Sequence, residues 1–150
     1  MTIERNLEIG RLWFEEMWSK PDVELAHKLI HPDYDPEWVH ISKKGPEQVI
    51  HEINYFRSAF HDLEYTIIDT TATETKVWVY YKAKAKHGGN AWGFEPTNKE
   101  VEIEGMAILE INEDGLVINR WGAYSFYDVL TDLEIVPPIW ELSKYFPEKK

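Results

Sequence analysis

The sequence predicts an α+β fold in which a curved antiparallel sheet wraps around helices that come first in the chain. Up to about residue 60 the apolar residues recur every three or four positions, which is typical of helices, and from residue 64 they recur every second position, which is typical of strands. The run Asn112-Glu113-Asp114-Gly115 is a strong hairpin signal, because Asp-Gly supplies the positive φ that tight turns need. Helices followed by antiparallel strands indicate the α+β class.

Three helices are expected before the sheet. Residues 4–19 form the first, since Ile9, Trp13 and Met17 stack at a spacing of four. Ser19 is then a suitable N-cap for a short second helix, with Pro21 early in it. Gly45-Pro46 opens a third helix. Its inward face is expected to hold Val49, Ile53, Phe56 and Phe60. We expect Trp13, Phe56 and Phe60 to be buried.

Four strands are expected at residues 64–70, 76–86, 99–111 and 116–125, and a further short one at 37–41. In the second strand Lys82, Lys84 and Lys86 alternate with less polar residues, so the lysines should face water. His87 should therefore share the inner face with Tyr81. A last short helix is expected at 126–133.

The chain ends in a further apolar cluster after Pro137-Pro138, a pair that stops the preceding helix. Its members are Ile139, Trp140, Leu142, Tyr145 and Phe146. Because large aromatic side chains are costly to leave in water, we expect this tail to fold back over the mouth of the sheet or onto a partner subunit.

Length and composition narrow the function. The 150 residues suit one domain, 1–150, with a sizeable core. A net charge of −11 argues against nucleic acid or an anionic membrane as a partner, and the chain has no cysteine for disulfide or thiolate chemistry. It shows neither a signal-like N-terminus nor a membrane-length apolar run, so a cytoplasmic protein is expected. Seven tryptophans indicate either an aromatic-lined cavity or simply a well-filled core.

Five short motifs, taken in order, resemble those of the SnoaL-like polyketide cyclase family. They are Gly45-Pro46-Glu47-Gln48-Val49, Ala59-Phe60-His61-Asp62, Ala85-Lys86-His87-Gly88-Gly89, Pro96-Thr97-Asn98-Lys99 and Asp132-Leu133-Glu134. The resemblance is close from residue 45 to Pro137 and looser before it. It implies a cone-shaped fold shared with nuclear transport factor two, scytalone dehydratase and ketosteroid isomerase, and it requires no cofactor or metal.

One position departs from the family pattern. In the cyclases an aspartate that transfers protons stands four residues after a tryptophan; here Ser125 stands four residues after Trp121. A serine hydroxyl without assistance cannot act as a base near neutral pH, but it can donate a hydrogen bond or simply make room. Asp128 would lie on a different face of the following helix.

His87 is then the best remaining acid–base candidate, since an unperturbed histidine titrates near pH 6.5; a structural role for it is the alternative. We expect His87 and Ser125 to be catalytic. The residues expected to bind substrate are Tyr81, Trp121, Tyr124, Trp92, Phe94 and His40. No spacing of histidines and carboxylates indicates a metal site, and no cofactor fingerprint is present.

The sequence thus predicts a protein that binds a small, flat, mostly apolar carbonyl compound. If it is an enzyme, it is a cofactor-free cyclase, isomerase or lyase. The alternative is a ligand-binding or assembly protein without turnover. A homodimer through the outer face of the sheet is expected, because Met106 and Ile108 are out of phase with Val101 and Ile103 and both faces then carry apolar groups.

Overall fold

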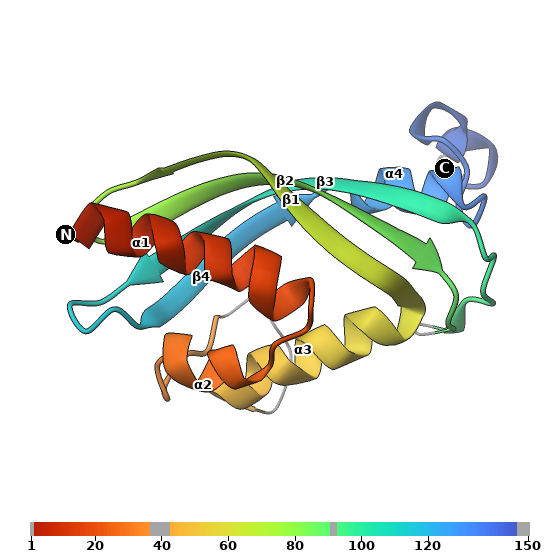
Figure 1. Cartoon of the computed structure of the whole chain (residues 1–150). Coiled ribbons are helices and arrows are strands. Elements are labelled where there is room, and N and C mark those ends of the chain that lie inside the picture. Colours follow the sequence, from red (N-terminus) through yellow and green to blue (C-terminus); the bar gives the residue numbers. More distant parts are fainter. Residues whose placement is uncertain (1, 37–42, 91–92, 147–150) are drawn as a thin grey trace.

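The protein adopts the predicted α+β architecture, a curved antiparallel sheet with helices on its concave side (Figure 1). The structure, a computed structural model, describes residues 2–36, 43–90 and 93–146. The sheet has the order β1-β2-β3-β4, with every neighbouring pair antiparallel. Its strands are β1 (Phe60–Ala72), β2 (Lys76–His87), β3 (Glu100–Ile111) and β4 (Val117–Tyr124). The helices before it are α1 (Thr2–Arg11), the π-helical η1 (Leu12–Trp18), α2 (Glu24–Leu29) and α3 (Pro46–Ala59).

The strand periodicity and the hairpin are confirmed. Along β2 the odd-numbered residues Val77 to His87 are buried, while Lys84 and Lys86 are exposed, so His87 does share the inner face with Tyr81. Gly115 has a φ of 78° and donates its N–H to the carbonyl of Asn112, which closes the turn between β3 and β4. The short strand expected at 37–41 lies outside the described residues.

The third helix ends earlier than its apolar spacing suggested. Phe60, expected on that helix, has extended backbone angles and is the first residue of β1, where it is 1% exposed. Trp13 is fully buried as predicted. Phe56 is only half-buried, because its ring lines a cavity that the sequence did not locate.

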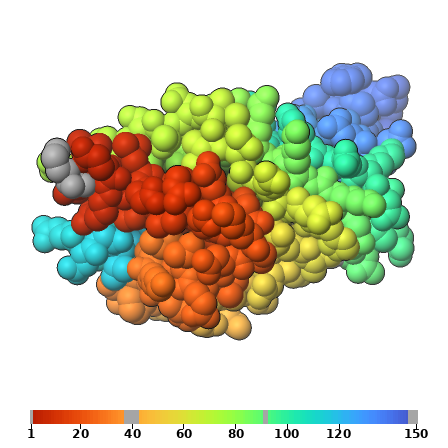
Figure 2. Space-filling view, viewed as in Figure 1, coloured from red at the N-terminus to blue at the C-terminus, as the bar shows by residue number. Residues whose placement is uncertain are grey.

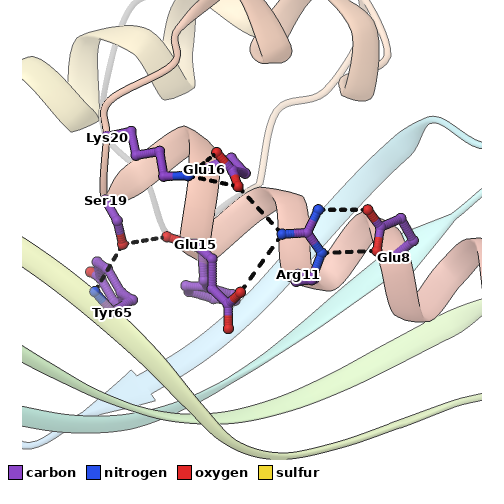
Figure 3. Close-up of polar contacts among 8 residues, drawn as sticks. Glu8, Arg11, Glu15, Glu16, Ser19, Lys20 and Tyr65 are labelled. Carbon is purple, nitrogen blue, oxygen red and sulfur yellow. Dashed lines mark hydrogen bonds and ion pairs between the residues drawn. The ribbon is translucent and has the colours of Figure 1, made fainter.

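The end of the first helix also differs from expectation. Instead of capping a second helix, Ser19 ties the first one to the sheet: its hydroxyl donates to the Phe14 carbonyl at 2.7 Å and accepts from the Tyr65 N–H at 2.8 Å (Figure 3). The backbone N–H of Ser19 also donates a hydrogen bond to the carbonyl of Phe14, five residues earlier, which is the spacing of a π-helix. The π turn therefore holds Phe14 and Trp18 in place against β1.

The C-terminal part comprises α4 (Phe126–Asp132) and the 3-10 helix η3 (Ile139–Lys144). The space-filling view shows this part standing out at the end of the molecule away from α1 (Figure 2). Trp140 is 79% exposed and Phe146 73%. The burial expected for these side chains is therefore not found within the chain. None of the described tail residues lines the cavity, so a lid is not formed; contact with a partner subunit stays a prediction.

Within the part of the chain that the structure describes, no helix combines the length and the apolar character that crossing a bilayer would require.

Candidate functional site

A cavity of about 410 Å³ lies between the helices and the inner face of the sheet. All four strands contribute to its wall, together with η1 and α3. The lining residues are Phe14, Trp18, His51, Glu52, Tyr55, Phe56, Tyr65, Tyr81, Ile103, Ala107, Arg120, Gly122 and Tyr124. The volume is within the range of small-molecule sites, about 300–1,000 Å³.

Most of the wall is aromatic. Phe14 lies 4.9 Å from Tyr81 and 5.3 Å from Tyr65 between ring centroids, and Tyr65 meets Tyr81 edge-on at 5.0 Å. Trp18 meets Tyr65 and Phe56 in the same edge-on manner, at 6.0 and 6.1 Å. Such a wall offers ring faces and edges to a flat apolar ligand, with tyrosine hydroxyls among them.

Gly105 on β3 leaves room for this arrangement. A methyl group placed on its Cα would come within 2.6 Å of the Tyr81 Oη and 2.7 Å of the Tyr124 Cβ. The Ala123 carbonyl oxygen would lie 2.8 Å away as well, so a side chain here would displace the Tyr81 hydroxyl or the β4 backbone, and the glycine keeps this space open.

The cavity also contains one oppositely charged pair. Arg120 Nη2 lies 3.7 Å from Glu52 Oε2, and each side chain is only 13% exposed. Glu52 stands on α3 three residues after Val49 and four before Phe56, which places it in the inward stripe of the helix. Arg120 stands on β4 opposite Leu109, whose side chain is fully buried on the inner face.

A β-bulge explains why Arg120 rather than Trp121 faces inward. Val117 pairs with Ile111, but Asn119 pairs with the preceding residue, Glu110, so Ile118 is an extra residue in the ladder. The inward phase consequently changes from odd to even numbers along β4. Without the bulge, the alternation from buried Val117 would have turned Trp121 inward.

The pKa values of the pair reflect its surroundings. Burial raises the pKa of Glu52 above the ordinary glutamate value, and the positive charge of Arg120, with a smaller effect from His51, offsets this only in part. Burial alone would lower the pKa of Arg120, but Tyr34, Glu52 and two further tyrosines raise it, so the guanidinium stays charged. A carboxyl with a raised pKa thus stands beside a permanent cation.

Three tyrosine hydroxyls of the cavity, those of Tyr65, Tyr81 and Tyr124, stay protonated. Burial raises the pKa of Tyr81 to about 12, and burial also raises the pKa of Tyr65 and of Tyr124. Neutral phenols are hydrogen-bond donors, so these groups can hold a carbonyl or enolate oxygen.

Two of the substrate-binding residues predicted from the sequence, Tyr81 and Tyr124, line the cavity. Trp121 does not: it lies on the outer face opposite Ile108, is 43% exposed, and has the Lys76 ammonium 5.6 Å from its ring centroid. The prediction that Trp121 belongs to the ligand site is wrong because of the bulge.

Of the other three predicted substrate-binding residues, the structure describes only Phe94. Phe94 is half-buried and is not among the lining residues; Trp92 and His40 lie outside the described residues.

The two predicted catalytic residues, Ser125 and His87, are not among the residues that line this cavity. Ser125 precedes α4, and its hydroxyl accepts the N–H of Glu104 at 3.0 Å while its own N–H donates to the Glu104 carbonyl at 2.8 Å. These contacts fasten the end of β4 to β3.

His87 is 1% exposed at the end of β2, where Nδ1 accepts the N–H of Thr97 at 3.2 Å and its ring lies 5.5 Å from that of Phe60. Burial lowers the pKa of His87, which favours the neutral ring. The catalytic role of both residues stays a prediction.

Sequence reasoning missed Glu52 and Arg120. Glu52 had a readable signal, since it is a charged residue inside the apolar stripe of the third helix. Arg120 had none, because its inward phase depends on the bulge. Among the described side chains, no group of three or more His, Cys, Asp or Glu could hold a metal ion.

Solved structures with the same fold come from several bacteria. A protein from Jannaschia sp. CCS1, described as a SnoaL-like polyketide cyclase, superposes with a TM-score of 0.78 at 20% identity, covering 91% of this chain and 96% of the other. IdmH from Streptomyces antibioticus, described as a polyketide cyclase, gives 0.71 at 20% identity over 87% and 99%. AclR from Streptomyces galilaeus, described as a hydroxylase, gives 0.70 at 23% identity over 95% and 90%.

These identities establish the fold alone, and a fold does not fix the reaction. Among curated proteins, none matches the sequence. The sequence model of the SnoaL-like polyketide cyclases matches residues 9–133, which include every described residue that lines the cavity. This chain therefore belongs to the family of SnoaL-like polyketide cyclases.

Proposed function

We propose that this protein binds a small, flat, mostly apolar carbonyl compound in the cavity and rearranges it as a cofactor-free cyclase or isomerase. The observation that carries the proposal is the aromatic-walled cavity of about 410 Å³ with Glu52 and Arg120 inside it. Family membership supports the same class of activity.

The chemistry of the wall supports this class of ligand. Rings of Phe14, Tyr65 and Tyr81 would pack against a flat apolar body, and the hydroxyls of Tyr81 and Tyr124 would donate to its carbonyl oxygen. Reactions that move a proton next to a carbonyl or join two carbons of one molecule need no redox partner, so the protein's own side chains are sufficient for them.

Binding can be tested with 2-naphthol, a flat bicyclic phenol, and 2-tetralone, the related ketone. We expect both to bind to the wild-type chain and to shift the NMR signals of the cavity residues. Tyr81→Phe should weaken 2-tetralone binding by roughly tenfold through loss of one buried hydrogen bond. Tyr80→Phe, on the outer face of the same strand, is the matched control and should leave binding unchanged. If neither probe reaches the cavity, the proposed ligand class is wrong.

The alternative function is ligand binding or assembly without turnover. Ser125 favours it, because the sequence resemblance aligns this residue with the proton-transferring aspartate of the cyclases. The two functions differ in one measurement: both predict that 2-tetralone binds, but only an enzyme accelerates loss of a proton from the carbon beside the carbonyl.

We further propose a homodimer through the outer face of the sheet. Met106 is 50% exposed there, beside the exposed Trp121, and the pairing of Met106 with Ala123 and of Ile108 with Trp121 makes the patch continuous across β3 and β4. Exposed apolar surface of this kind is costly unless it is covered.

Light scattering at tens of micromolar should therefore give the mass of two chains. Met106→Lys should shift the protein towards the monomer, whereas Ile3→Lys, at a similarly exposed position on α1, should leave the dimer intact. A wild-type monomer at this concentration would contradict the proposal.

A further inference from the structure

We propose that Glu52 is the catalytic carboxylate of this cavity, taking a proton from the carbon beside the substrate's carbonyl, and that Arg120 stabilises the resulting enolate oxygen. This inference rests on the proposed function and goes beyond it by assigning the reacting groups. Like the proposed function, it requires a substrate with a C–H next to a carbonyl on a flat apolar frame.

The position of Glu52 supports this role. Its carboxylate lies inside the cavity rather than at the surface, 13% exposed, and comes from the helix that faces the sheet. The sequence lacks a carboxylate at position 125, and the structure turns Ser125 to the Glu104 backbone. Among the described residues, Glu52 is the only acidic side chain in the lining of this cavity.

One oxygen of the carboxylate, the buried Oε2, is not held in a hydrogen bond by the described residues. Oε2 is 3.7 Å from Arg120 Nη2, which is beyond hydrogen-bond distance, and among the described residues it accepts no hydrogen bond. A carboxylate held in several short hydrogen bonds would be a weak base. Burial raises the pKa of Glu52, and this brings its basicity closer to that needed near neutral pH.

Arg120 supplies the complementary charge. When the carbon loses its proton, the electron pair moves onto the carbonyl oxygen, and negative charge appears there. A guanidinium in a site with little water stabilises such a charge far more than it would in solution. The neutral hydroxyls of Tyr81 and Tyr124 can donate to the same oxygen.

The step balances without a co-reactant. The C–H bond breaks, an O–H bond forms on Glu52, and the C–C bond to the carbonyl carbon gains double-bond character. In an isomerisation, Glu52 returns its proton to another carbon of the enolate. In a cyclisation, the enolate carbon forms a C–C bond with a second carbonyl of the same molecule, and Glu52 returns its proton to the new alkoxide.

The test follows deuterium uptake into 2-tetralone in D₂O by proton NMR, so the natural substrate is not needed. Wild-type protein should accelerate uptake at the carbon between the ring and the carbonyl. Glu52→Gln should lower this rate by about 10²–10⁴-fold, the usual contribution of a positioned acid or base. Glu52→Asp should restore part of it. Glu47→Gln, an exposed acid on the same helix, is the matched control and should keep the full rate.

Two further measurements separate a catalytic role from a structural one. The wild-type rate should rise with pH through a pKa above the ordinary glutamate value of about 4.3, and this limb should be absent in Glu52→Gln. Binding of 2-naphthol should change less than about threefold in Glu52→Gln, which would show that the cavity remains formed.

The outcomes distinguish this inference from the proposed function. If the wild type binds both probes and exchanges deuterium but Glu52→Gln keeps the rate, Glu52 is not the base and the proposed function stands. Loss of exchange in His87→Ala or Ser125→Ala, with Glu52→Gln active, would move the role to those residues. Binding without exchange in the wild type overturns the catalytic assignment in favour of the non-catalytic alternative. No binding overturns both.

Discussion

Replacing Arg120 with methionine is expected to destabilise the fold by about 3 kcal/mol at pH 8, the lower end of the range for breaking a buried ion pair. The lower end applies because each partner is 13% exposed and the pair is 3.7 Å apart. Without Arg120, Glu52 would stay in the cavity with no strong positive charge nearby to offset its burial. Loss of that charge should raise the pKa of Glu52 further.

The pH dependence of this loss has a definite sign. A carboxyl whose folded-state pKa is raised binds more protons when folded, so its stabilising protonation is complete below the unfolded-state pKa of about 4.3 and is lost as pH rises through the folded-state value. The deficit of Arg120→Met should therefore shrink between pH 8 and pH 5. Urea unfolding at both pH values measures it.

Two variants serve as controls for this prediction. In Arg120→Met the Glu52 carboxylate has lost its partner, and adding Glu52→Gln removes that unpaired charge. The double variant should therefore recover part of the lost stability. Its free energy of unfolding should not show this change between pH 5 and pH 8. Arg11→Met breaks only ion pairs at or near the surface, those with Glu8, Glu15 and Glu16, and should cost under about 1 kcal/mol. If Arg120→Met loses the same free energy of unfolding at both pH values, the unpaired charge of Glu52 is not the cause of the destabilisation.

Gly45→Ala is expected to be similarly damaging, for a backbone reason. Gly45 precedes α3 with φ 66° and ψ −149°, a region that is close to exclusive to glycine. A Cβ there would also lie 2.6 Å from the Pro32 carbonyl oxygen. Strain and clash together should cost about 3 kcal/mol or more. Because α3 also carries Tyr55 and Phe56 of the cavity wall, the same change should weaken 2-naphthol binding.

The matched control is Gly93→Ala. Gly93 also has a positive φ, 78°, but a Cβ on it would meet no described atom within 4 Å. Its substitution should cost only the conformational term, about 1–2 kcal/mol. Thermal and urea unfolding of the two variants compares the terms directly. If Gly45→Ala and Gly93→Ala lose the same free energy of unfolding, the chain near Pro32 can move away from the added methyl group at no cost. The close approach of Gly45 to Pro32 would then not fix the position of α3.

The parts of the fold that were predictable from the sequence depend on local patterns. The lysine alternation of β2 and the Asp114-Gly115 turn were confirmed because each depends on residues only a few positions apart. The bulge at Ile118 was not predictable, since it depends on how β4 registers with β3. Because the extra residue in that ladder was not recognised, Trp121 was predicted to face the cavity, whereas Arg120 faces it.

The candidate site follows the same division. Tyr81 was placed correctly, because its strand alternates without interruption. Glu52 carried a local signal, a charge within an apolar stripe, but a family motif drew attention to position 125 instead. The contact of Ser125 with the Glu104 backbone joins residues twenty-one positions apart, and no local pattern encodes it.

The π-helical segment Leu12–Trp18 makes the cavity wall adjustable by chain length. Because its turns close over five residues, it holds more residues than an α-helix would over the same rise. Deleting one residue would let the segment close as an α-helix, while α1 and the Ser19 link to β1 could stay in place. Because a π turn contains one residue more than an α-helical turn, removing that residue would leave the side chains on both sides pointing in their present directions. In an evolving lineage, one codon lost or gained here could therefore change the length of this segment of the cavity wall without changing the sheet.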